Sequence, residues 1–382
     1  MKILIIPMSA VAQTEGPFSR AESLAKVFLE REMQVAFCSG DSVRPVNGVT
    51  WYPLSVPVPM GLPKWIALRT YPLADKLGII GRKTIHSFEE VLHLTGASTY
   101  SYLQVSIEEI RSAIRRFQPD VVYSEFNLSA IIAAKAEDKP ILASYSFPTQ
   151  PSYAASPQFA RGVNKVLIEL KQPQVKSALE LFGRADCKVI PSSNILEPIV
   201  EENCLFVGPF KKVCSVQASE QKNNILVYMG NGTVSKKQIR KTVFEAFSSA
   251  PFEVYVAGMD VQEDHGNIHL ARRFDFSKLL ANTAVYINHG GQNSIMDGFL
   301  YAVPQLICPG RVFERKYNAE SVEQNGAGII IDLSEFQADI ISKDVERLIT
   351  NKSFLNNAKQ LGLSLNSLGG ADAVADYIIA NF

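Results

Sequence analysis

Two glycine-rich segments carry the residues best suited to binding a phosphate group. The first is Asn288-His289-Gly290-Gly291, which follows an apolar run at Ala284–Ile287 that predicts a buried strand. A helix is expected from Ser294 onward, so the glycines form a tight turn between strand and helix. Backbone N–H groups and the positive end of a helix dipole meet at such a turn, which favours a bound phosphate. His289 can donate to a phosphate oxygen, and Asp297, one helical turn beyond Ser294, can accept from sugar hydroxyls.

The second segment is Gly230-Asn231-Gly232-Thr233, between a predicted strand at Asn224–Met229 and a predicted helix at Lys236–Phe247. Its two glycines allow the backbone to approach a diphosphate closely, and Thr233 adds a hydroxyl group. In both segments, a turn that binds no ligand would explain the same spacing.

The pattern that begins at His289 continues in a specific order. Ser294 and Asp297 follow the glycines, then come Tyr301-Ala302-Val303-Pro304, Leu306 and Pro309, and finally Glu314, Asn318 and Ala319. This order resembles the donor-site signature of inverting nucleotide-sugar glycosyltransferases, the family that contains the UDP-glucuronosyltransferases and the macrolide glycosyltransferases. The family signature runs roughly H-G-G-x-x-S-x-x-E, then Y-G-V-P-x-L-x-x-P, then D-Q-x-x-N-A.

The resemblance implies a fold and a co-substrate. The fold is α/β, with two Rossmann-like domains that face each other across a cleft, an architecture known as GT-B. The second domain would bind the donor and the first domain the acceptor. The donor would be a UDP- or dTDP-hexose. No other cofactor and no metal ion are expected, since backbone amides and a helix dipole can neutralise the leaving group and the chain has no Asp-x-Asp motif.

The resemblance also assigns roles to individual residues. Phe274 lies where relatives place an aromatic ring beside the nucleobase, although a phenylalanine at a strand end is often a core residue. Glu314 stands where relatives carry an aspartate that binds hexose hydroxyls. Arg315 replaces a glutamine, and a fixed cation there could meet a carboxylate or a phosphate, or pair with Glu314. The expected donor-binding residues are Gly230, Asn231, Gly232, Thr233, Phe274, His289, Gly290, Gly291, Asn293, Ser294, Asp297, Glu314 and Arg315.

The first domain departs from the family where the catalytic base is expected. Relatives carry G-H-V-(S/T)-R after the first strand, and that histidine removes a proton from the acceptor hydroxyl. This chain has Gly16-Pro17-Phe18-Ser19-Arg20 instead, and proline cannot accept a proton. Ser19 and Glu22 form a capping-box pattern, which predicts that a helix starts there.

Three alternatives follow from the missing histidine. Glu125, at the end of a strand predicted at Asp120–Ser124, or Glu15, beside the turn, could act as the catalytic base. A carboxylate at a strand end is also a common helix cap. The acceptor could instead be ionised already and need no base. Finally, the chain could be catalytically silent and bind its ligands as a scaffold or partner subunit.

Short apolar segments alternate with helical stretches along the chain, a pattern typical of parallel α/β sheets. The strand candidates of the first half are Lys2–Met8, Gln34–Ser39, Val49–Leu54, Asp120–Ser124, Ile141–Ser146, Lys188–Pro191 and Leu205–Val207. Those of the second half are Asn224–Met229, Glu253–Ala257, Ile268–Ala271, Val285–Asn288, Gln305–Cys308 and Gly328–Asp332.

A domain boundary is expected at Gly208-Pro209-Phe210, which precedes the polar run Gln217–Asn224. We therefore expect an acceptor-binding domain at 1–208 and a nucleotide-sugar-binding domain at 209–365. The remaining segment, 366–382, is expected to form a helix that crosses back to the first domain, as in relatives.

The segment Tyr52–Leu103 interrupts the regular alternation. It is rich in proline, tryptophan, tyrosine and leucine. Such a stretch inside a compact domain is either a functional loop or a pair of helices that pack on each other. As a functional loop, it would form a wall for an apolar or lipid-like acceptor.

Composition narrows the protein class. The 382 residues suffice for two domains that each bury a core. The chain has 38 basic residues (lysine and arginine) and 38 acidic residues (aspartate and glutamate), so its net charge gives no sign of nucleic-acid binding. Five scattered cysteines form no close metal-type pair, and the first apolar run, Lys2–Pro7, is too short for a signal peptide or a membrane span. These features favour a cytoplasmic protein, and leave peripheral membrane contact and the oligomeric state open.

Taken together, the residues and the resemblance predict a hexosyltransferase that moves a sugar from UDP or dTDP to a small apolar or lipid-like acceptor, with inversion at the anomeric carbon. A catalytically silent partner subunit is the non-enzyme alternative. A nucleotide-sugar 2-epimerase, which shares the architecture but needs no acceptor segment, is the second enzyme alternative.

Overall fold

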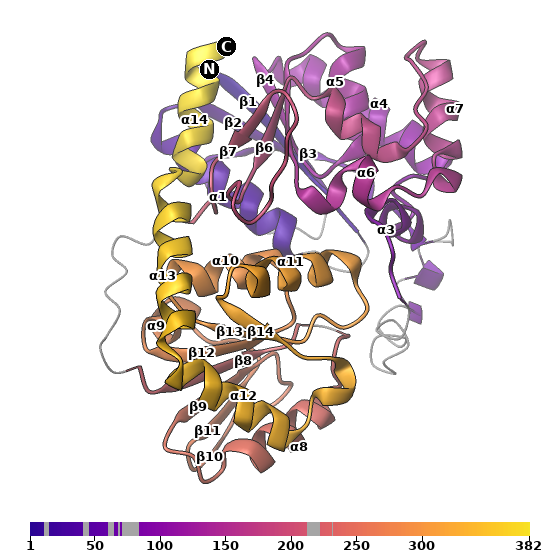
Figure 1. Cartoon of the computed structure of the whole chain (residues 1–382). Coiled ribbons are helices and arrows are strands. Elements are labelled where there is room, and N and C mark those ends of the chain that lie inside the picture. Colours follow the sequence, from indigo (N-terminus) through magenta and orange to yellow (C-terminus); the bar gives the residue numbers. More distant parts are fainter. Residues whose placement is uncertain are drawn as a thin grey trace. The chain divides into compact units, whose positions relative to one another are not determined.

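The computed structural model describes residues 1–10, 15–40, 46–59, 65–67, 69–70, 84–211, 222–230 and 232–382, apart from the side chain of Glu15 (Figure 1). The chain forms two compact units. Unit 1 comprises Met1–Leu73, His86–Lys211 and Leu368–Phe382, and unit 2 comprises Ala74–Ile85 and Lys212–Ser367. Each unit is built on its own mainly parallel sheet, as expected for two Rossmann-like domains.

Unit 1 contains a parallel sheet with the strand order β3-β2-β1-β4-β5-β6-β7. The strands are β1 (Lys2–Pro7), β2 (Gln34–Ser39), β3 (Thr50–Pro53), β4 (Val121–Glu125), β5 (Ile141–Ser144), β6 (Cys187–Ile190) and β7 (Cys204–Phe206). The central strands β1, β2 and β4 are almost entirely buried, which explains their continuous apolar sequences.

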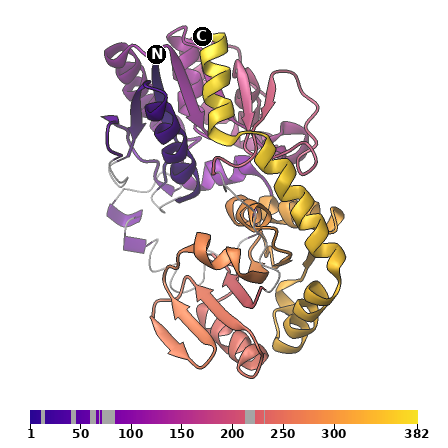
Figure 2. The same cartoon turned by 90° about the vertical axis from the view of Figure 1, so that its left-hand side faces the viewer.

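Helices cover both faces of this sheet. They are α1 (Glu15–Glu30), α3 (Phe88–Thr95), α4 (Tyr100–Phe117), α5 (Leu128–Ala136), α6 (Pro151–Ala154), α7 (Arg161–Glu169) and α14 (Gly370–Asn381). Ile3 and Ile5 of β1 share a core cluster with residues of α1 and α14. On the other face, α4 packs on β1 and β2, and α5 packs on β4 and β5. Figures 1 and 2 show both chain termini at the same end of unit 1.

Unit 2 contains a second sheet, with the order β10-β11-β9-β8-β12-β13-β14. The strands are β8 (Asn224–Tyr228), β9 (Glu253–Ala257), β10 (Glu263–His265), β11 (Ile268–Ala271), β12 (Thr283–Asn288), β13 (Gln305–Ile307) and β14 (Gly328–Ile330). All neighbours pair in parallel except β10, which pairs antiparallel with β11 at one edge. The sequence analysis did not predict β10, because Glu263-Asp264-His265 shows no apolar alternation.

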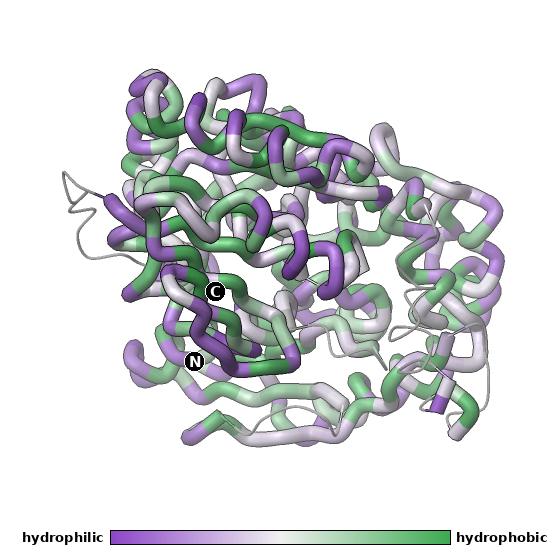
Figure 3. The backbone as a smooth tube through the Cα atoms, turned by 90° about the horizontal axis from the view of Figure 1, so that it is seen from below, coloured by the Kyte–Doolittle hydropathy of each residue, from purple (hydrophilic) through white to green (hydrophobic). Residues whose placement is uncertain are grey.

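The helices of unit 2 are α8 (Lys236–Phe247), α9 (Phe276–Ala281), α10 (Gln292–Leu300), α11 (Phe313–Gln324), α12 (Ala338–Thr350) and α13 (Lys352–Ser367). Ile225 and Val227 of β8 lie in the core cluster under α8 and α12, whereas Leu226 between them packs with α9 on the opposite face. Coloured by hydropathy, the covering helices alternate between apolar and polar residues along their turns, as amphipathic helices do (Figure 3).

Two predicted helix starts were wrong. Helix α1 begins at Glu15, so Ser19 lies inside the helix instead of capping it. Pro17 falls in the first turn, where a helix tolerates proline because the N–H groups there have no intrahelical partner. Helix α10 begins at Gln292, two residues earlier than predicted, with Gly291 as its N-cap.

The described part of the segment Tyr52–Leu103 contains α3 and the start of α4, joined by a short turn that includes Gly96. Residues 60–64, 68 and 71–83 lie outside the described residues. Glu89 ties α3 to the rest of unit 1: its carboxylate accepts from the backbone N–H of Ser156 at 2.6 Å, the hydroxyl of Ser177 at 2.8 Å and the N–H of Ala178 at 2.6 Å.

None of the described helices combines the length and the apolar character needed to cross a membrane. Of the five cysteines, Cys38, Cys187, Cys204 and Cys308 are free thiols, and Cys214 lies outside the described residues.

Candidate functional site

The turn after β12 has the geometry that the sequence predicted. Gly290 adopts a φ of +78°, a conformation that side-chain-bearing residues rarely take. The first helical hydrogen bond of α10 runs from the N–H of Ile295 to the carbonyl of Gly291 at 3.0 Å. Gly291 is the N-cap residue and has no side chain that could accept from the N–H groups of the first turn. Asn293 and the buried Ser294 therefore lie in the first helical turn, whose N–H groups point toward the glycine turn.

A chain of buried amide side chains holds this turn in place. The N–H of Gly290 donates to Asn288 Oδ1 at 2.8 Å, and Asn288 Nδ2 donates to Gln305 Oε1 at 2.8 Å. Gln305 Nε2 donates in turn to the carbonyl of Ile295 on α10 at 3.0 Å. On the other side, Asn318 Nδ2 of α11 donates to the carbonyl of Gly290 at 2.9 Å. The sequence analysis did not single out Asn288 or Gln305, and Asn318 entered only as part of the family signature.

The loop after β8 approaches the same turn. Gly230 and Gly232 have φ angles of +56° and +82°. A Cβ atom added to Gly230 would lie 3.0 Å from His289 Nε2, so a side chain there would crowd the imidazole, and the positive φ of Gly230 also favours glycine. Asn231 between them lies outside the described residues. Ser235 then caps α8 by accepting from the N–H of Gln238 at 3.2 Å.

His289 lies at the point where the two loops meet. Its ring is half-buried and packs edge-on against Tyr228, with a centroid distance of 5.6 Å and an interplanar angle of 90°. Its Nδ1 lies 3.4 Å from the backbone carbonyl of Tyr228. Burial and the positive charge of Arg315 lower the pKa of His289 to about 3. The imidazole is therefore neutral at physiological pH.

Arg315, in the first turn of α11, contacts the loop after β8. Its Nη1 donates to Thr233 Oγ1 at 2.6 Å. Burial lowers the pKa of this guanidinium, against the opposing effects of Glu314 and Tyr228. Since successive helical residues point about 100° apart, Glu314 and Arg315 face different directions. The structure thus brings the loop after β8, the glycine turn and the start of α11 together in unit 2.

Two other predicted donor residues, Asp297 and Phe274, lie in separate parts of unit 2. Asp297 is half-buried in the second turn of α10, and its charge acts on Tyr286 and Tyr301. Phe274 lies between β11 and α9, where its ring packs edge-on against Tyr255 with a centroid distance of 5.5 Å.

Tyr228 is an aromatic side chain that the sequence analysis missed. Its ring contacts both His289 and Phe276, the latter at a centroid distance of 5.6 Å. Its position at the end of a buried strand, directly before the glycine loop, was the available signal.

In unit 1, Glu125 lies at the carboxyl end of β4 with no exposed surface. Arg20 Nε and Nη2 contact its Oε1 at 2.7 and 2.6 Å, and the hydroxyl of Ser144 donates to Oε2. Burial raises the pKa of Glu125, and Arg20 and Ser144 partly offset this effect. Both carboxylate oxygens are therefore engaged within unit 1. The side chain of Glu15, the other candidate base, lies outside the described residues.

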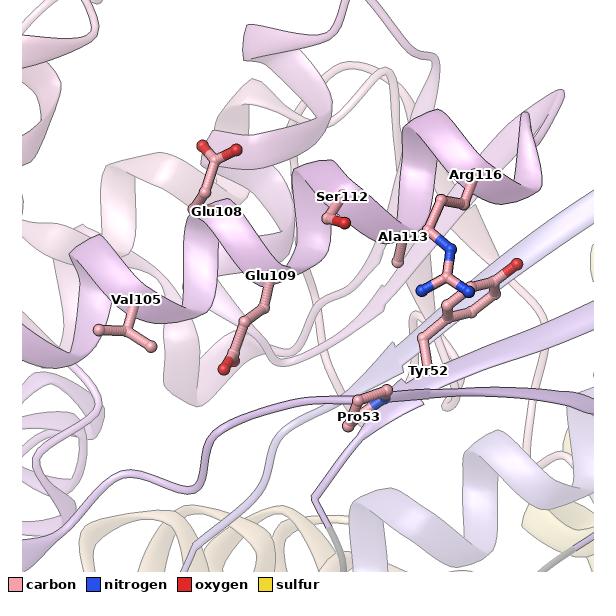
Figure 4. Close-up of a pocket in the computed structure, with 8 residues that line it drawn as sticks. All are labelled: Tyr52, Pro53, Val105, Glu108, Glu109, Ser112, Ala113 and Arg116. Atoms are coloured by element: carbon pink, nitrogen blue, oxygen red, sulfur yellow. The ribbon is translucent and has the colours of Figure 1, made fainter.

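A separate pocket of about 390 Å³ lies between β3 and α4 (Figure 4). Its lining residues are Tyr52, Pro53, Val105, Glu108, Glu109, Ser112, Ala113 and Arg116. Glu109 accepts from the N–H and the hydroxyl of Ser55, both at 2.7 Å, and Arg116 lies 5.4 Å from the ring centroid of Tyr52. None of the predicted catalytic or donor-binding residues lines this pocket.

Comparisons with known proteins find sequence relatives and similar folds. A family model described as the C-terminal domain of proteins similar to erythromycin biosynthesis protein CIII matches residues 254–378. The chain is 23% identical over 316 residues to the uncharacterized UDP-glucosyltransferase YojK of Bacillus subtilis (strain 168), a match that covers 77% of this chain and 75% of YojK.

Solved structures show the same fold along the whole chain. The glycotransferase of kitacinnamycin matches with a TM-score of 0.75 at 16% identity, covering 99% of this chain and 98% of that one. The glycosyltransferase VinC, solved in complex with dTDP, matches with a TM-score of 0.68 at 16% identity, covering 100% and 99%. The two Rossmann-like sheets and these matches agree with the resemblance that the sequence suggested: the chain has the GT-B fold and is similar to nucleotide-sugar glycosyltransferases.

Proposed function

We propose that this protein transfers a hexose from a UDP- or dTDP-sugar to a small apolar or lipid-like acceptor, with inversion at the anomeric carbon. The observation that carries the proposal is the convergence of two glycine loops, His289 and Arg315 at one point of unit 2. Backbone amides, a helix N-terminus and a cation together form a site suited to a diphosphate. The dTDP in VinC and the UDP-glucosyltransferase name of YojK support the choice of donor.

Within this proposal, different donor-binding residues bind different parts of the nucleotide sugar. The diphosphate is bound by the two glycine loops and the first turn of α10. These residues are Gly230, Gly232, Thr233, His289–Gly291, Asn293 and Ser294. Asp297 accepts from the ribose hydroxyls, Glu314 accepts from the hexose hydroxyls, and Phe274 packs beside the nucleobase. Asn231 belongs to the same loop and shares this proposed role.

On the acceptor side, the geometry favours an attacking oxygen that is already ionised. A general base must contact the acceptor hydroxyl, whereas Glu125 is fully buried and both of its oxygens are engaged. Only its raised pKa agrees with the role of a base. A carboxylate or phosphate on an otherwise apolar acceptor would attack without losing a proton.

Purified protein with UDP-glucose or dTDP-glucose, with and without candidate acceptors, tests the transfer. We expect nucleoside diphosphate release to depend on the acceptor, and the proton NMR spectrum of the product to show the inverted anomeric configuration. Apolar carboxylic acids should be better acceptors than the matching alcohols. Release of the nucleoside diphosphate at the same rate without any acceptor would contradict the proposal.

A catalytically silent, donor-binding partner is the second candidate. Pro17 in place of the catalytic histidine and the buried pair of Arg20 and Glu125 favour it. A silent partner would bind UDP or dTDP but transfer no sugar to acids or alcohols. A screen of nucleotide sugars by thermal shift, followed by the transfer assay, separates the two candidates, since a bound donor raises the stability of the folded protein.

A further inference from the structure

The loops of unit 2 leave little space for added side-chain atoms where they meet. A Cβ atom on Gly290 would lie 2.8 Å from the carbonyl oxygen of Arg315, and one on Gly310 would lie 2.9 Å from Thr233 Cγ2. The stretch from Gly310 to Arg315 therefore packs directly against both glycine loops. Its position is set by backbone contacts as well as by the bond between Arg315 and Thr233.

This packing leaves the guanidinium of Arg315 without a full counter-charge. Within the described part of the chain, it donates to the Thr233 hydroxyl and forms no ion pair. Glu314, its neighbour in sequence, acts on it only through the longer-range charge interaction. A cation that has lost part of its hydration needs an anionic partner, and here the guanidinium lies against the glycine loop that contains Thr233.

His289 cannot supply positive charge at the same place. It is neutral, and a carbonyl oxygen only accepts, so the contact with Tyr228 requires the ring proton on Nδ1. At 3.4 Å this bond is long, so the proton can move to Nε2 and be donated to a ligand at little cost. His289 then offers one hydrogen bond and no charge. The charged group that acts on it is Arg315.

We propose that Arg315 is the fixed cation of the donor site: its guanidinium binds the diphosphate of the nucleotide sugar and stabilises the nucleoside diphosphate as it leaves. This inference rests on the proposed function. In the transfer step, the bond between the anomeric carbon and the β-phosphate oxygen breaks, and its electron pair stays on that oxygen. The ionised acceptor oxygen forms the new bond to the carbon. Arg315 meets the negative charge that appears on the leaving group.

Arg315→Gln, which places the family's glutamine at this position, is the main test. Lys316→Gln is the matched control, because it removes the same charge from the adjacent, exposed residue of α11. Calorimetric titration with UDP and with uridine measures both variants. We expect Arg315→Gln to weaken UDP binding about 10- to 100-fold, with little change for uridine, as for loss of a charged hydrogen bond. Lys316→Gln should bind UDP as the wild type does.

A comparison of two donors shows whether Arg315 binds the diphosphate or a charged group on the sugar. If Arg315 binds the diphosphate, Arg315→Gln weakens UDP-glucose and UDP-glucuronate to the same extent. A loss confined to UDP-glucuronate would assign Arg315 to the sugar carboxylate and overturn the proposal. Arg315→Lys keeps the charge but not the planar fork, so it should fall between wild type and Arg315→Gln, and it preserves the test if the glutamine variant fails to fold.

The remaining outcomes separate this inference from the function on which it rests. Wild-type protein that binds neither UDP nor dTDP would overturn both. Wild-type protein that binds UDP, together with an Arg315→Gln variant of equal affinity, would overturn only the role of Arg315. An equal loss in Arg315→Gln and Lys316→Gln would show a general charge effect and would also overturn it.

Discussion

Arg20 and Glu125 form a buried ion pair in which two guanidinium nitrogens share one carboxylate oxygen, at 2.7 and 2.6 Å. The side chain of Arg20 is 13% exposed and that of Glu125 is 0% exposed. The pair joins α1 to the carboxyl end of β4. It occupies the position at which the sequence suggested a catalytic base.

We expect Glu125→Gln to lower the free energy of unfolding by about 3–5 kcal/mol, because it leaves the guanidinium of Arg20 buried without its counter-charge. Arg20→Met should lower the free energy of unfolding by a similar amount, since it leaves the carboxylate of Glu125 buried without a counter-charge. The double variant Arg20→Met/Glu125→Leu should recover most of the loss, because apolar side chains of similar volume often replace a buried ion pair without net cost. Chemical denaturation of the four proteins measures these differences.

Activity of the same double variant separates the structural role from a catalytic one. A purely structural pair predicts that the folded double variant keeps the wild-type rate with every acceptor that the wild type uses, whether ionised or a hydroxyl. If Glu125 acted as the base, transfer to a hydroxyl acceptor would fall by about 10²–10⁴-fold even though the protein is folded and binds UDP.

His289→Ala should weaken UDP-glucose binding by about 1.5–3 kcal/mol, the usual range for a hydrogen bond to a charged group. Because the pKa of His289 is about 3, the wild-type affinity should not change with pH. Titration calorimetry with UDP-glucose between about pH 5.5 and 8.5 measures this, since a histidine with that pKa gains no proton in the range. Affinity that falls steadily as the pH rises would show that the bound state needs a charged His289.

Asp297→Asn should weaken the binding of UDP and uridine alike, because it replaces one of the two carboxylate oxygens proposed to accept from the ribose. The neighbouring Met296 is buried on the core side of α10, so Met296→Leu, which conserves volume, should leave both affinities unchanged. Equal losses in the two variants would indicate that helix packing, and not contact with the ribose, explains the effect.

His269 should make the stability of unit 2 depend on pH. Its Nδ1 contacts Asp264 at 2.6 Å and its Nε2 contacts Glu253 at 2.8 Å. Burial lowers the pKa of His269, but the hydrogen bonds and charges of these two carboxylates outweigh it and raise the pKa overall. The contribution to stability is therefore fully present below the unfolded-state pKa of about 6.5 and is lost as the pH rises through the folded-state value.

The variant His269→Gln should accordingly lose more stability at about pH 5.5 than at about pH 9. Thermal unfolding at the two pH values measures the difference, with His86→Gln, a change at an exposed histidine, as the control. A loss of the same size at both pH values would contradict a role for the charged imidazole.

The sequence predicted the strands of both sheets well, because continuous apolar segments such as Gln34–Ser39 and Glu253–Ala257 have few other uses in an α/β chain. It missed β10, whose charged side chains are satisfied by Arg240, His269 and one another. The start of α1 was wrong because Ser19 and Glu22 imitate a capping box within a helix that already begins at Glu15.

The glycine turn of the site was predictable because local residues determine it. The side chains that hold it were not, since Asn288, Gln305 and Asn318 come from three separate elements and leave no local pattern. The engaged state of Glu125 was hidden for the same reason: its partners Arg20 and Ser144 lie 105 and 19 residues away in the chain.

Helix α14 has a consequence for the order in which the units can fold. Its residues Val374 and Ile378 are fully buried in the core that also contains Ile3 and Ile5 of β1, and Arg31 of the turn after α1 pairs with Asp372 and Asp376. A ribosome synthesises the chain from its N-terminus, so α14 emerges only after all of unit 2. Unit 1 is therefore synthesised first, but one apolar face of its sheet stays partly uncovered until α14 has been made. Unit 2 is synthesised later and can complete its core before unit 1 does.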